Sequence, residues 1–256
     1  MFVPANISIF SSPNHFPIQP KHMYAFLITL AIIPGLLICF YIFKMDKFEK
    51  EPKIPLFLSF CLGVGLVFPA IWLEEYAHDS GLNDFETLLD TFIYAIIGVA
   101  LIEEGIKFLG LWAYPYHRPF FNEPMDGIVF SVVISMGFAT FENIIYADRF
   151  GLETTLVRAF TAVPAHATFG VMMGYFVGRA KFEPAKSASL LASGLGMAVL
   201  FHAIYDFFLI QEMFEWLSGF AIVTLYLAIR YTRALIKLHQ VNSPFHPDAG
   251  GPPTEV

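Results

Sequence analysis

Residues 23–43 read MYAFLITLAIIPGLLICFYIF, a run that contains no charged side chain. A bilayer core of roughly 30 Å is crossed by a helix of about 20 apolar residues. The run therefore predicts a membrane-spanning helix. Few positive charges precede it and several follow it, which is the reverse of a secretory signal peptide, so we expect this helix to be retained.

Similar apolar runs recur along the rest of the chain. The 256 residues are 56% hydrophobic and 14% charged, with a mean hydropathy of +0.61, whereas a soluble domain is about 45–50% apolar. Spans are predicted near residues 23–43, 54–73, 88–112, 127–147, 155–178, 188–210 and 214–236. We therefore expect an all-α fold, a polytopic membrane helix bundle of about seven transmembrane helices.

These runs leave no room for a separate soluble domain. We expect a single integral-membrane domain over residues 1–240 and a disordered tail over residues 241–256, where proline and glycine replace apolar residues. The net charge of −7 excludes a general basic surface, so nucleic acid is not an expected partner and the lipid bilayer is.

Lysine and arginine accumulate on one side of the seven-span arrangement. That side holds Lys44, Lys47, Lys50, Lys53, Arg118, Arg179, Lys181, Lys186, Arg230, Arg233 and Lys237, whereas the other side holds Lys21 and Arg149. Cytoplasmic connections carry the excess of positive charge in membrane proteins. We therefore expect the amino terminus outside the cell and the carboxyl terminus in the cytoplasm.

The third predicted span contains Glu103, Glu104 and Lys107 in an otherwise apolar run. A charge at the bilayer centre costs at least about 2.5–3.5 kcal/mol, and the spacing of four and three residues brings both carboxylates within reach of the lysine. A buried salt bridge that fixes helix packing is one explanation, but pairing does not need the second carboxylate. Repulsion between the two makes one a better proton acceptor, so Glu103 is a candidate general base.

The fourth span ends in Phe141-Glu142-Asn143-Ile144-Ile145-Tyr146, where Glu142 and Tyr146 share one helical stripe. This adds a third intramembrane carboxylate. Because Glu142 lies near a helix end, it could instead reach the membrane interface, and the residues alone leave both interpretations open.

The fifth span places His166 on the same face as Gly170, Gly174 and Gly178. Glycine at intervals of four lets a neighbouring helix approach closely. Pro164 is expected to kink this span near the histidine, because proline cannot donate a backbone hydrogen bond. Both features favour a functional site around His166.

The sixth span contains His202 and Asp206 at a spacing that lets the carboxylate hold the ring in one tautomer. One such pair could be a packing feature, but ionisable residues in several helices of one small bundle favour a functional site. Counting along the spans puts Glu103 nearer the cytoplasmic end and Glu142 and His202 nearer the outer ends. Their convergence therefore requires tilted or broken helices.

Together, Glu103-Glu104-x-x-Lys107, Phe141-Glu142-x-x-x-Tyr146, His166-x-x-x-Gly170 and His202-x-x-x-Asp206 resemble the ordered motifs of the PrsW family of membrane proteases. The stretch from Tyr41 to Pro52 is similar as well, and the likeness runs from about residue 24 to residue 236. This family looks related to the CAAX prenyl endopeptidases and the bacteriocin-processing enzymes.

The resemblance implies an intramembrane endopeptidase that uses a glutamate-activated water. Glu103 would be the base, Glu104 and Lys107 its electrostatic support, and His166 and His202 the groups that polarise the scissile carbonyl or act as further ligands. Glu142, Asn143 and Tyr146 would support the site. Where the prenyl enzymes commonly have asparagine, this chain has Asp206, which would instead orient His202.

The resemblance also implies a biological role. The substrate would be a single-span membrane protein such as an anti-sigma factor, cut at its first site during envelope stress signalling. The protease would be a multi-pass protein of the bacterial cell (inner) membrane.

Two questions stay open at this stage. A carboxylate and two histidines also suit zinc, with Glu103, His166 and His202 as ligands, although the likeness to the prenyl endopeptidases favours a site without a tightly held metal.

Buried carboxylates, a lysine and histidines also build proton-coupled transporters, and a catalytically inactive regulatory protein could keep the same fold. No His-Glu-x-x-His motif of a zinc site-2 protease is present in the sequence.

Overall fold

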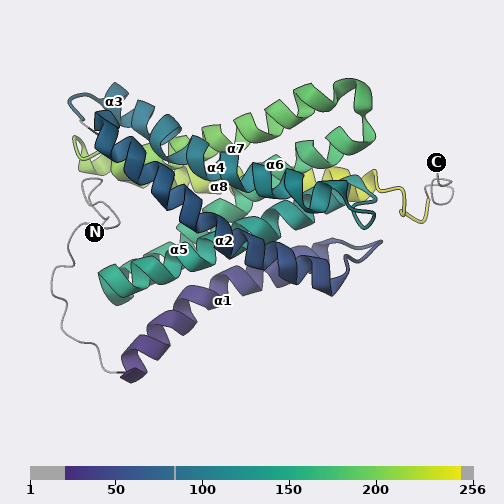
Figure 1. Cartoon of the computed structure of the whole chain (residues 1–256), viewed down its shortest axis with the longest axis horizontal. Coiled ribbons are helices and arrows are strands. Elements are labelled where there is room, and N and C mark those ends of the chain that lie inside the picture. The colour runs from purple at the N-terminus through teal and green to yellow at the C-terminus, as the bar shows by residue number, and fades with distance from the viewer. Residues whose placement is uncertain (1–20, 84, 249–256) are drawn as a thin grey trace.

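The computed structural model describes residues 21–83 and 85–248, and these residues form helices joined by short connections, without a β-strand. The α-helices are α1 (Lys21–Met45), α2 (Lys53–Ala77), α3 (Leu88–Ile93), α4 (Leu101–Ala113), α5 (Pro124–Phe160), α6 (Ala162–Phe182), α7 (Ser187–Ile210) and α8 (Gly219–Val241). A π-helical stretch, Tyr94–Ala100, joins α3 to α4. Figure 1 shows the resulting elongated bundle, which confirms the predicted all-α fold.

The helices are long and apolar enough for a multi-pass membrane protein. Five stretches qualify by length and composition, namely Met23–Met45, Lys53–Leu82, Pro124–Phe182, Pro184–Ile210 and Glu215–Val241. The third of them contains both α5 and α6, and the helix that carries Glu103, Glu104 and Lys107 is not among the five. The helical membrane bundle is therefore confirmed, whereas the count of seven spans stays a prediction.

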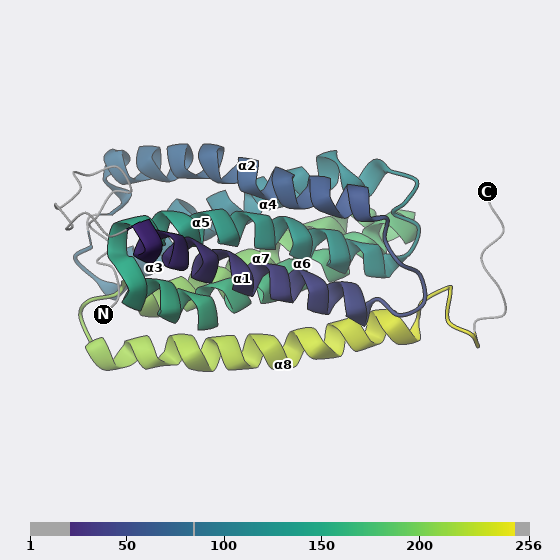
Figure 2. The ribbon, with the colours of Figure 1, turned by 90° about the horizontal axis from the view of Figure 1, so that it is seen from below.

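The outer helices expose large apolar side chains. Leu37 on α1 is 62% exposed, Phe57 on α2 is 66% exposed and Leu227 on α8 is 54% exposed. Continuous apolar surfaces of this kind are unfavourable in water and are expected against lipid tails. In contrast, α5 and α6 lie at the centre of the bundle, as Figure 2 shows, and most of their residues are buried.

Glycines bring α5 and α6 together. A Cβ atom added to Gly174 would collide with the backbone of Gly127, and one added to Gly178 would collide with the backbone of Pro124. The small-residue face predicted around His166 is thus confirmed, and the helix that approaches it is α5. Close backbone approach at small residues is a common way to hold membrane helices together.

The junction between α5 and α6 differs from the prediction. The chain kinks at Gly151, whose φ of 73° and ψ of −159° are readily adopted only by glycine, and a short helical segment continues to Phe160. Because α6 begins at Ala162, Pro164 lies in its first turn, where a missing backbone N–H breaks no helical hydrogen bond. Pro164 is therefore not the source of a kink next to His166, and Arg158 precedes α6 rather than lying inside it.

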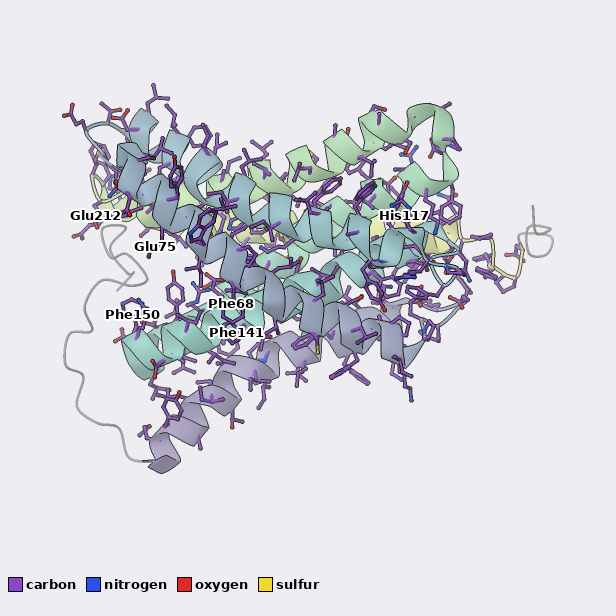
Figure 3. The ribbon with its side chains drawn as sticks, viewed as in Figure 1. Phe68, Glu75, His117, Phe141, Phe150 and Glu212 are labelled. Carbon is purple, nitrogen blue, oxygen red and sulfur yellow. The ribbon has the colours of Figure 1, made fainter. Side chains whose placement is uncertain are left out.

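The two ends of the bundle are occupied by different connections. Figure 3 shows Glu75, Phe150 and Glu212 toward one end and His117 toward the other. At the His117 end, the chain beyond α8 returns to the bundle, where Ser243 donates a hydrogen bond to the Glu123 carboxylate and the His246 ring lies 4.8 Å from the ring of Phe48. Residues 1–20, and residues 249–256 of the tail expected to be disordered, lie outside the described residues.

Candidate active site

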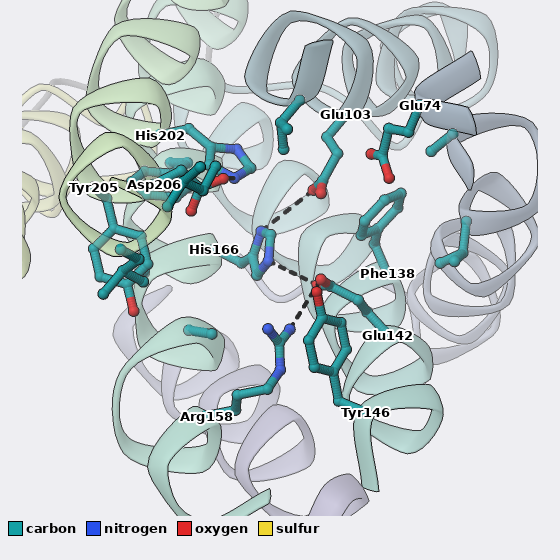
Figure 4. A pocket seen from close by; sticks show the side chains of 18 of the residues that line it. Glu74, Glu103, Phe138, Glu142, Tyr146, Arg158, His166, His202, Tyr205 and Asp206 are labelled. Carbon is teal, nitrogen blue, oxygen red and sulfur yellow. Dashed lines mark hydrogen bonds and ion pairs between the residues drawn. The ribbon is translucent and has the colours of Figure 1, made fainter. Parts of the chain in front are cut away.

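A cavity of about 220 Å³ lies between α2, α5, α6, α7 and the helix formed by α3 and α4. It lies toward the end of the bundle where α2 and α7 terminate and α5 kinks, because its lining includes His78, Thr154 and Ile210. Glu103, Glu142, Tyr146, His166, His202 and Asp206 also line it. The structure thus brings together residues from four separate predicted spans (Figure 4).

Lys107 lies at the centre of the buried charges. Its Nζ is 2.8 Å from Glu103 Oε2, 2.8 Å from Glu104 Oε1 and 3.1 Å from His166 Nδ1. The same ammonium lies 4.1 Å from the centroid of the Phe138 ring, and the residue is 1% exposed. One cation therefore compensates two adjacent carboxylates, as their spacing in the sequence predicts.

His166 bridges this lysine and Glu142. Its Nε2 lies 3.0 Å from Glu142 Oε2, and its Nδ1 faces the Lys107 ammonium. An ammonium group can only donate, so Nδ1 must accept and Nε2 must carry the proton that is donated to Glu142. The neighbours thereby select the tautomer of His166, with the lone pair of Nδ1 directed at the Lys107 ammonium.

His202 has a carboxylate at each ring nitrogen. Nδ1 lies 3.0 Å from Glu104 Oε1, and Nε2 lies 3.2 Å from Asp206 Oδ2, the neighbour that the sequence spacing predicts. Phe169 stacks on the imidazole with the ring centroids 4.7 Å apart. The contacts on both edges and on the face hold the ring in one orientation.

Arg158 organises the supporting residues of the site. Its guanidinium lies 3.0 Å from Glu142 Oε1 and 3.7 Å from the centroid of the Tyr146 ring. Its Nε donates to Asn143 Oδ1 over 3.3 Å, and Asn143 in turn donates to the Ala31 carbonyl of α1. The sequence predicted no role for Arg158, so its link to Glu142 comes from the structure.

Glu74 is a second residue that the sequence did not single out. It lines the cavity from α2, and Figure 4 places it near Glu103 and Phe138. Its Oε1 is buried and has no hydrogen-bond partner within residues 21–83 and 85–248. In the sequence, Glu74 follows an apolar run and precedes Glu75, a pattern that is also typical of the wet end of a span.

The donors around Lys107 fit a metal ion. Glu103, Glu104, His166 and His202 each offer one ligand atom, and these atoms all lie within 4.8 Å of one another. Imidazole nitrogen and carboxylate oxygen are ligands of catalytic zinc. Each histidine also has a carboxylate beyond it, Glu142 or Asp206, which is the arrangement that orients metal-binding histidines.

Two further observations bear on that fit. Glu104 Oε2 is buried without a hydrogen-bond partner among the described residues, so it has a lone pair to offer. The Lys107 ammonium lies among the same donors, so a metal ion and this ammonium would compete for them.

The family model described as PrsW family intramembrane metalloprotease matches residues 51–232. Among known proteins, the chain is similar to a Protease PrsW of Geobacillus kaustophilus (strain HTA426), with 33% identity over 227 residues, 88% of this chain and 96% of that protein. A Protease PrsW of Bacillus subtilis (strain 168) is 34% identical over 184 residues, 72% and 82% of the two chains. A Protease PrsW of Clostridioides difficile (strain 630) is 32% identical over 220 residues, which cover 84% of this chain and 90% of that protein. No solved structure matches the chain.

Proposed function

The chain belongs to the PrsW family of intramembrane metalloproteases and is thus a membrane-embedded hydrolase of peptide bonds, and on that premise we propose that Glu103 activates the attacking water. The position of Glu103 carries this proposal. It lines the cavity, whereas the adjacent Glu104 is 0% exposed and does not. A general base must lie within hydrogen-bond reach of the water that it deprotonates.

The environment of Glu103 suits a proton acceptor. Lys107 binds its Oε2, so Oε1 is left to accept a proton from water. As the hydroxide oxygen bonds to the carbonyl carbon, the proton moves to Glu103. The same proton then passes to the amine nitrogen when the C–N bond breaks, which returns Glu103 to its carboxylate form.

We assign His166 and His202 to the carbonyl oxygen of the substrate or to a metal that polarises it. Both line the cavity, and their orientation is set by Glu142 and Asp206. Charge that develops on the carbonyl oxygen is best stabilised by groups already oriented before the reaction.

If a metal is bound, Glu104, His166 and His202 are the residues that we expect to hold it. This set differs from the Glu103, His166 and His202 set expected from the sequence, because Glu103 faces the cavity and Glu104 is buried behind it with a free oxygen. The chemistry that zinc supplies in such a site is Lewis-acid polarisation of a carbonyl and activation of water.

The proposed substrate is a single-span membrane protein of the anti-sigma-factor kind, and the proposed location is the bacterial cell membrane. The cavity lies at the end of the bundle opposite to the connection after α1, which contains Lys47 and Lys50. Since positive connections face the cytoplasm, we place the cavity near the outer surface, the amino terminus outside and the carboxyl terminus inside.

Cleavage by the purified full-length protein in detergent tests the function. A single-span anti-sigma factor should be cut by the wild type and left intact by Glu103→Gln at equal abundance, with the products identified by mass spectrometry. Glu212→Gln is the matched control, because Glu212 is exposed in the connection between α7 and α8. Normal cleavage by Glu103→Gln would remove the proposed base. Ion-driven uptake by proteoliposomes without cleavage would instead support a transporter.

Single cysteines test the orientation. With Cys39 and Cys61 replaced by alanine, Ser80→Cys should react with an impermeant thiol reagent on intact cells and Lys50→Cys should not, since both positions are exposed at opposite ends of the bundle. The reverse labelling pattern would show that the sides are inverted.

A further inference from the structure

A second group of carboxylates lies at the other end of the bundle, in and around the connection from α1 to α2. Asp46, Glu49 and Glu51 belong to this connection, while Glu123 and Asp126 lie at the start of α5. We call these five residues the loop cluster. Glu49, Glu51 and Asp126 each present one ligand atom, and these atoms lie within 4.8 Å of one another. The cavity, in contrast, is lined by the far end of α2 and by the kinked end of α5.

Apart from the half-buried Glu49, the residues of the loop cluster are buried, and none has an ion-pair partner among the described residues. Glu51 is 2% exposed, Asp46 1% and Asp126 0%. Within the described residues, no member of the loop cluster forms a salt bridge. The nearby lysines have other partners, since Lys50 donates to the Phe43 carbonyl and Lys181 to the Arg118 carbonyl.

Five oxygens of the cluster also lack a hydrogen-bond donor among the described residues. Both carboxylate oxygens of Glu51 are buried without a hydrogen-bond partner among the described residues, as are Asp46 Oδ2, Glu49 Oε2 and Asp126 Oδ1. The other oxygen of Asp126 accepts hydrogen bonds from the backbone amides of Asn122 and Glu123. Asp126 is thus fixed by one oxygen, its other oxygen has no donor among the described residues, and Glu51 lies nearby.

Such an arrangement is electrostatically unfavourable when left alone. Burial and the nearby Asp126 both disfavour a charged Asp46, and the charge of Lys50 opposes them. Buried polar groups are normally satisfied, so a nearly inaccessible glutamate with two free oxygens indicates a ligand that the protein itself does not supply.

We propose that Glu49, Glu51 and Asp126 bind a divalent cation that prefers oxygen ligands, of the Mg²⁺, Ca²⁺ and Mn²⁺ class. Carboxylate oxygens are the preferred ligands of these ions, and zinc in proteins is bound instead by sets that include histidine or cysteine. The bound ion joins the connection before α2 to the first turn of α5. This role is structural and separate from the peptidase site at the other end of the bundle.

A shared proton is the competing explanation. Glu51 and Asp126 are close enough for one protonated carboxyl to donate to the other, which would satisfy both without an ion. The two explanations differ in what Glu51→Gln does, because glutamine keeps a hydrogen-bond donor for Asp126 but removes the charge that a cation needs.

Binding of Mn²⁺ to the full-length protein tests the proposal. The protein in detergent is freed of metal with a chelator and desalted, and bound Mn²⁺ is measured by electron paramagnetic resonance, with Mg²⁺ and Ca²⁺ as competitors. The variants are Glu51→Gln and the half-buried Glu49→Gln, with Glu212→Gln as the matched exposed control and His202→Ala to remove a donor from the peptidase site.

We expect one Mn²⁺ whose affinity falls by about 10-fold or more in Glu51→Gln and Glu49→Gln, and is unchanged in Glu212→Gln and His202→Ala. Mg²⁺ should displace it and should raise the melting temperature of the wild type but not of Glu51→Gln. Loss of binding in His202→Ala alone would assign the ion to the peptidase site and overturn the proposal. Absence of Mn²⁺ binding to the wild type would also overturn it, as would equal affinity in the wild type and Glu49→Gln. If no Mn²⁺ binds and metal-free Glu51→Gln is more stable than the metal-free wild type, the shared proton is favoured.

Discussion

The charged residues around the cavity and those of the loop cluster are both buried, yet their charges are balanced differently. Around the cavity, Glu103 and Glu104 share Lys107, and Glu142 lies against Arg158. In the loop cluster, the described residues provide neither an ion pair nor enough donors for Glu51 and Asp126. Apart from Glu74, the first group has its own cations, and the second requires an ion or protons from solution.

This difference indicates different uses of the same side-chain chemistry. A carboxylate that must accept and release a proton during turnover needs fixed neighbours whose charge does not change. A carboxylate that binds an exchangeable ion must keep its oxygens free when the ion is absent. The comparison therefore predicts that variants of the two groups affect separate properties.

The largest expected effect is on turnover. Glu103→Gln should lower cleavage by about 10³-fold or more, because glutamine keeps the size of the side chain but cannot accept a proton. The same variant should bind Mn²⁺ with unchanged affinity, since the loop cluster lies at the opposite end of the bundle. Cleavage rates and Mn²⁺ titrations on one preparation measure both properties, and a weaker Mn²⁺ affinity in Glu103→Gln would show that the two groups are coupled.

The next effect is on stability. Lys107→Met should lower the free energy of unfolding by about 3–5 kcal/mol, because it leaves two buried carboxylates without their cation. Lys237→Met, at an exposed position on α8, should change it by less than about 0.5 kcal/mol. Thermal denaturation in detergent with a chelator present compares the two. Similar melting temperatures for both variants would contradict the assignment of Lys107 as the internal counter-charge.

The histidine variants distinguish a metal-free site from a metal site. His166→Ala and His202→Ala should each lower turnover by about 10²–10³-fold, because each removes an oriented group next to the cavity. In a zinc enzyme, both would also lose bound metal, and prolonged treatment with a strong chelator would silence the wild type. Elemental analysis beside the cleavage assay separates these outcomes. Near-normal activity of both variants would make the histidines packing features.

The smallest effect concerns the orientation of one ring. Asp206→Asn should lower turnover by about 10–100-fold, less than His202→Ala, because it weakens the contact to Nε2 while Glu104 still faces Nδ1. Asp148→Asn, an exposed change on α5, serves as the matched control and should leave the rate near that of the wild type. If Asp206→Asn and Asp148→Asn have equal rates, Asp206 has no positioning role.

The helical membrane fold and six of the polar residues that line the cavity could be predicted from the sequence. Glu103, Glu104 and Lys107 stand out because charges are rare in apolar runs, and the His202 and Asp206 pair follows from helical spacing. Glu74 and Arg158 were not assigned roles, because charges near the ends of spans are ordinary. The loop cluster was also missed, since its carboxylates resemble a wet connection between helices.

What the sequence by itself determined is local: which segments are apolar enough for lipid, and which polar residues share a helix face. Those properties follow from composition and from the period of the α-helix. Only the tertiary structure decided which faces meet. The kink at Gly151 and the π-helical stretch before α4 break the regular helices on which counting along spans relies, and the Glu51 to Asp126 proximity joins residues 75 positions apart. Contacts of that kind depend on helix packing, which the spacing of residues along one helix does not encode.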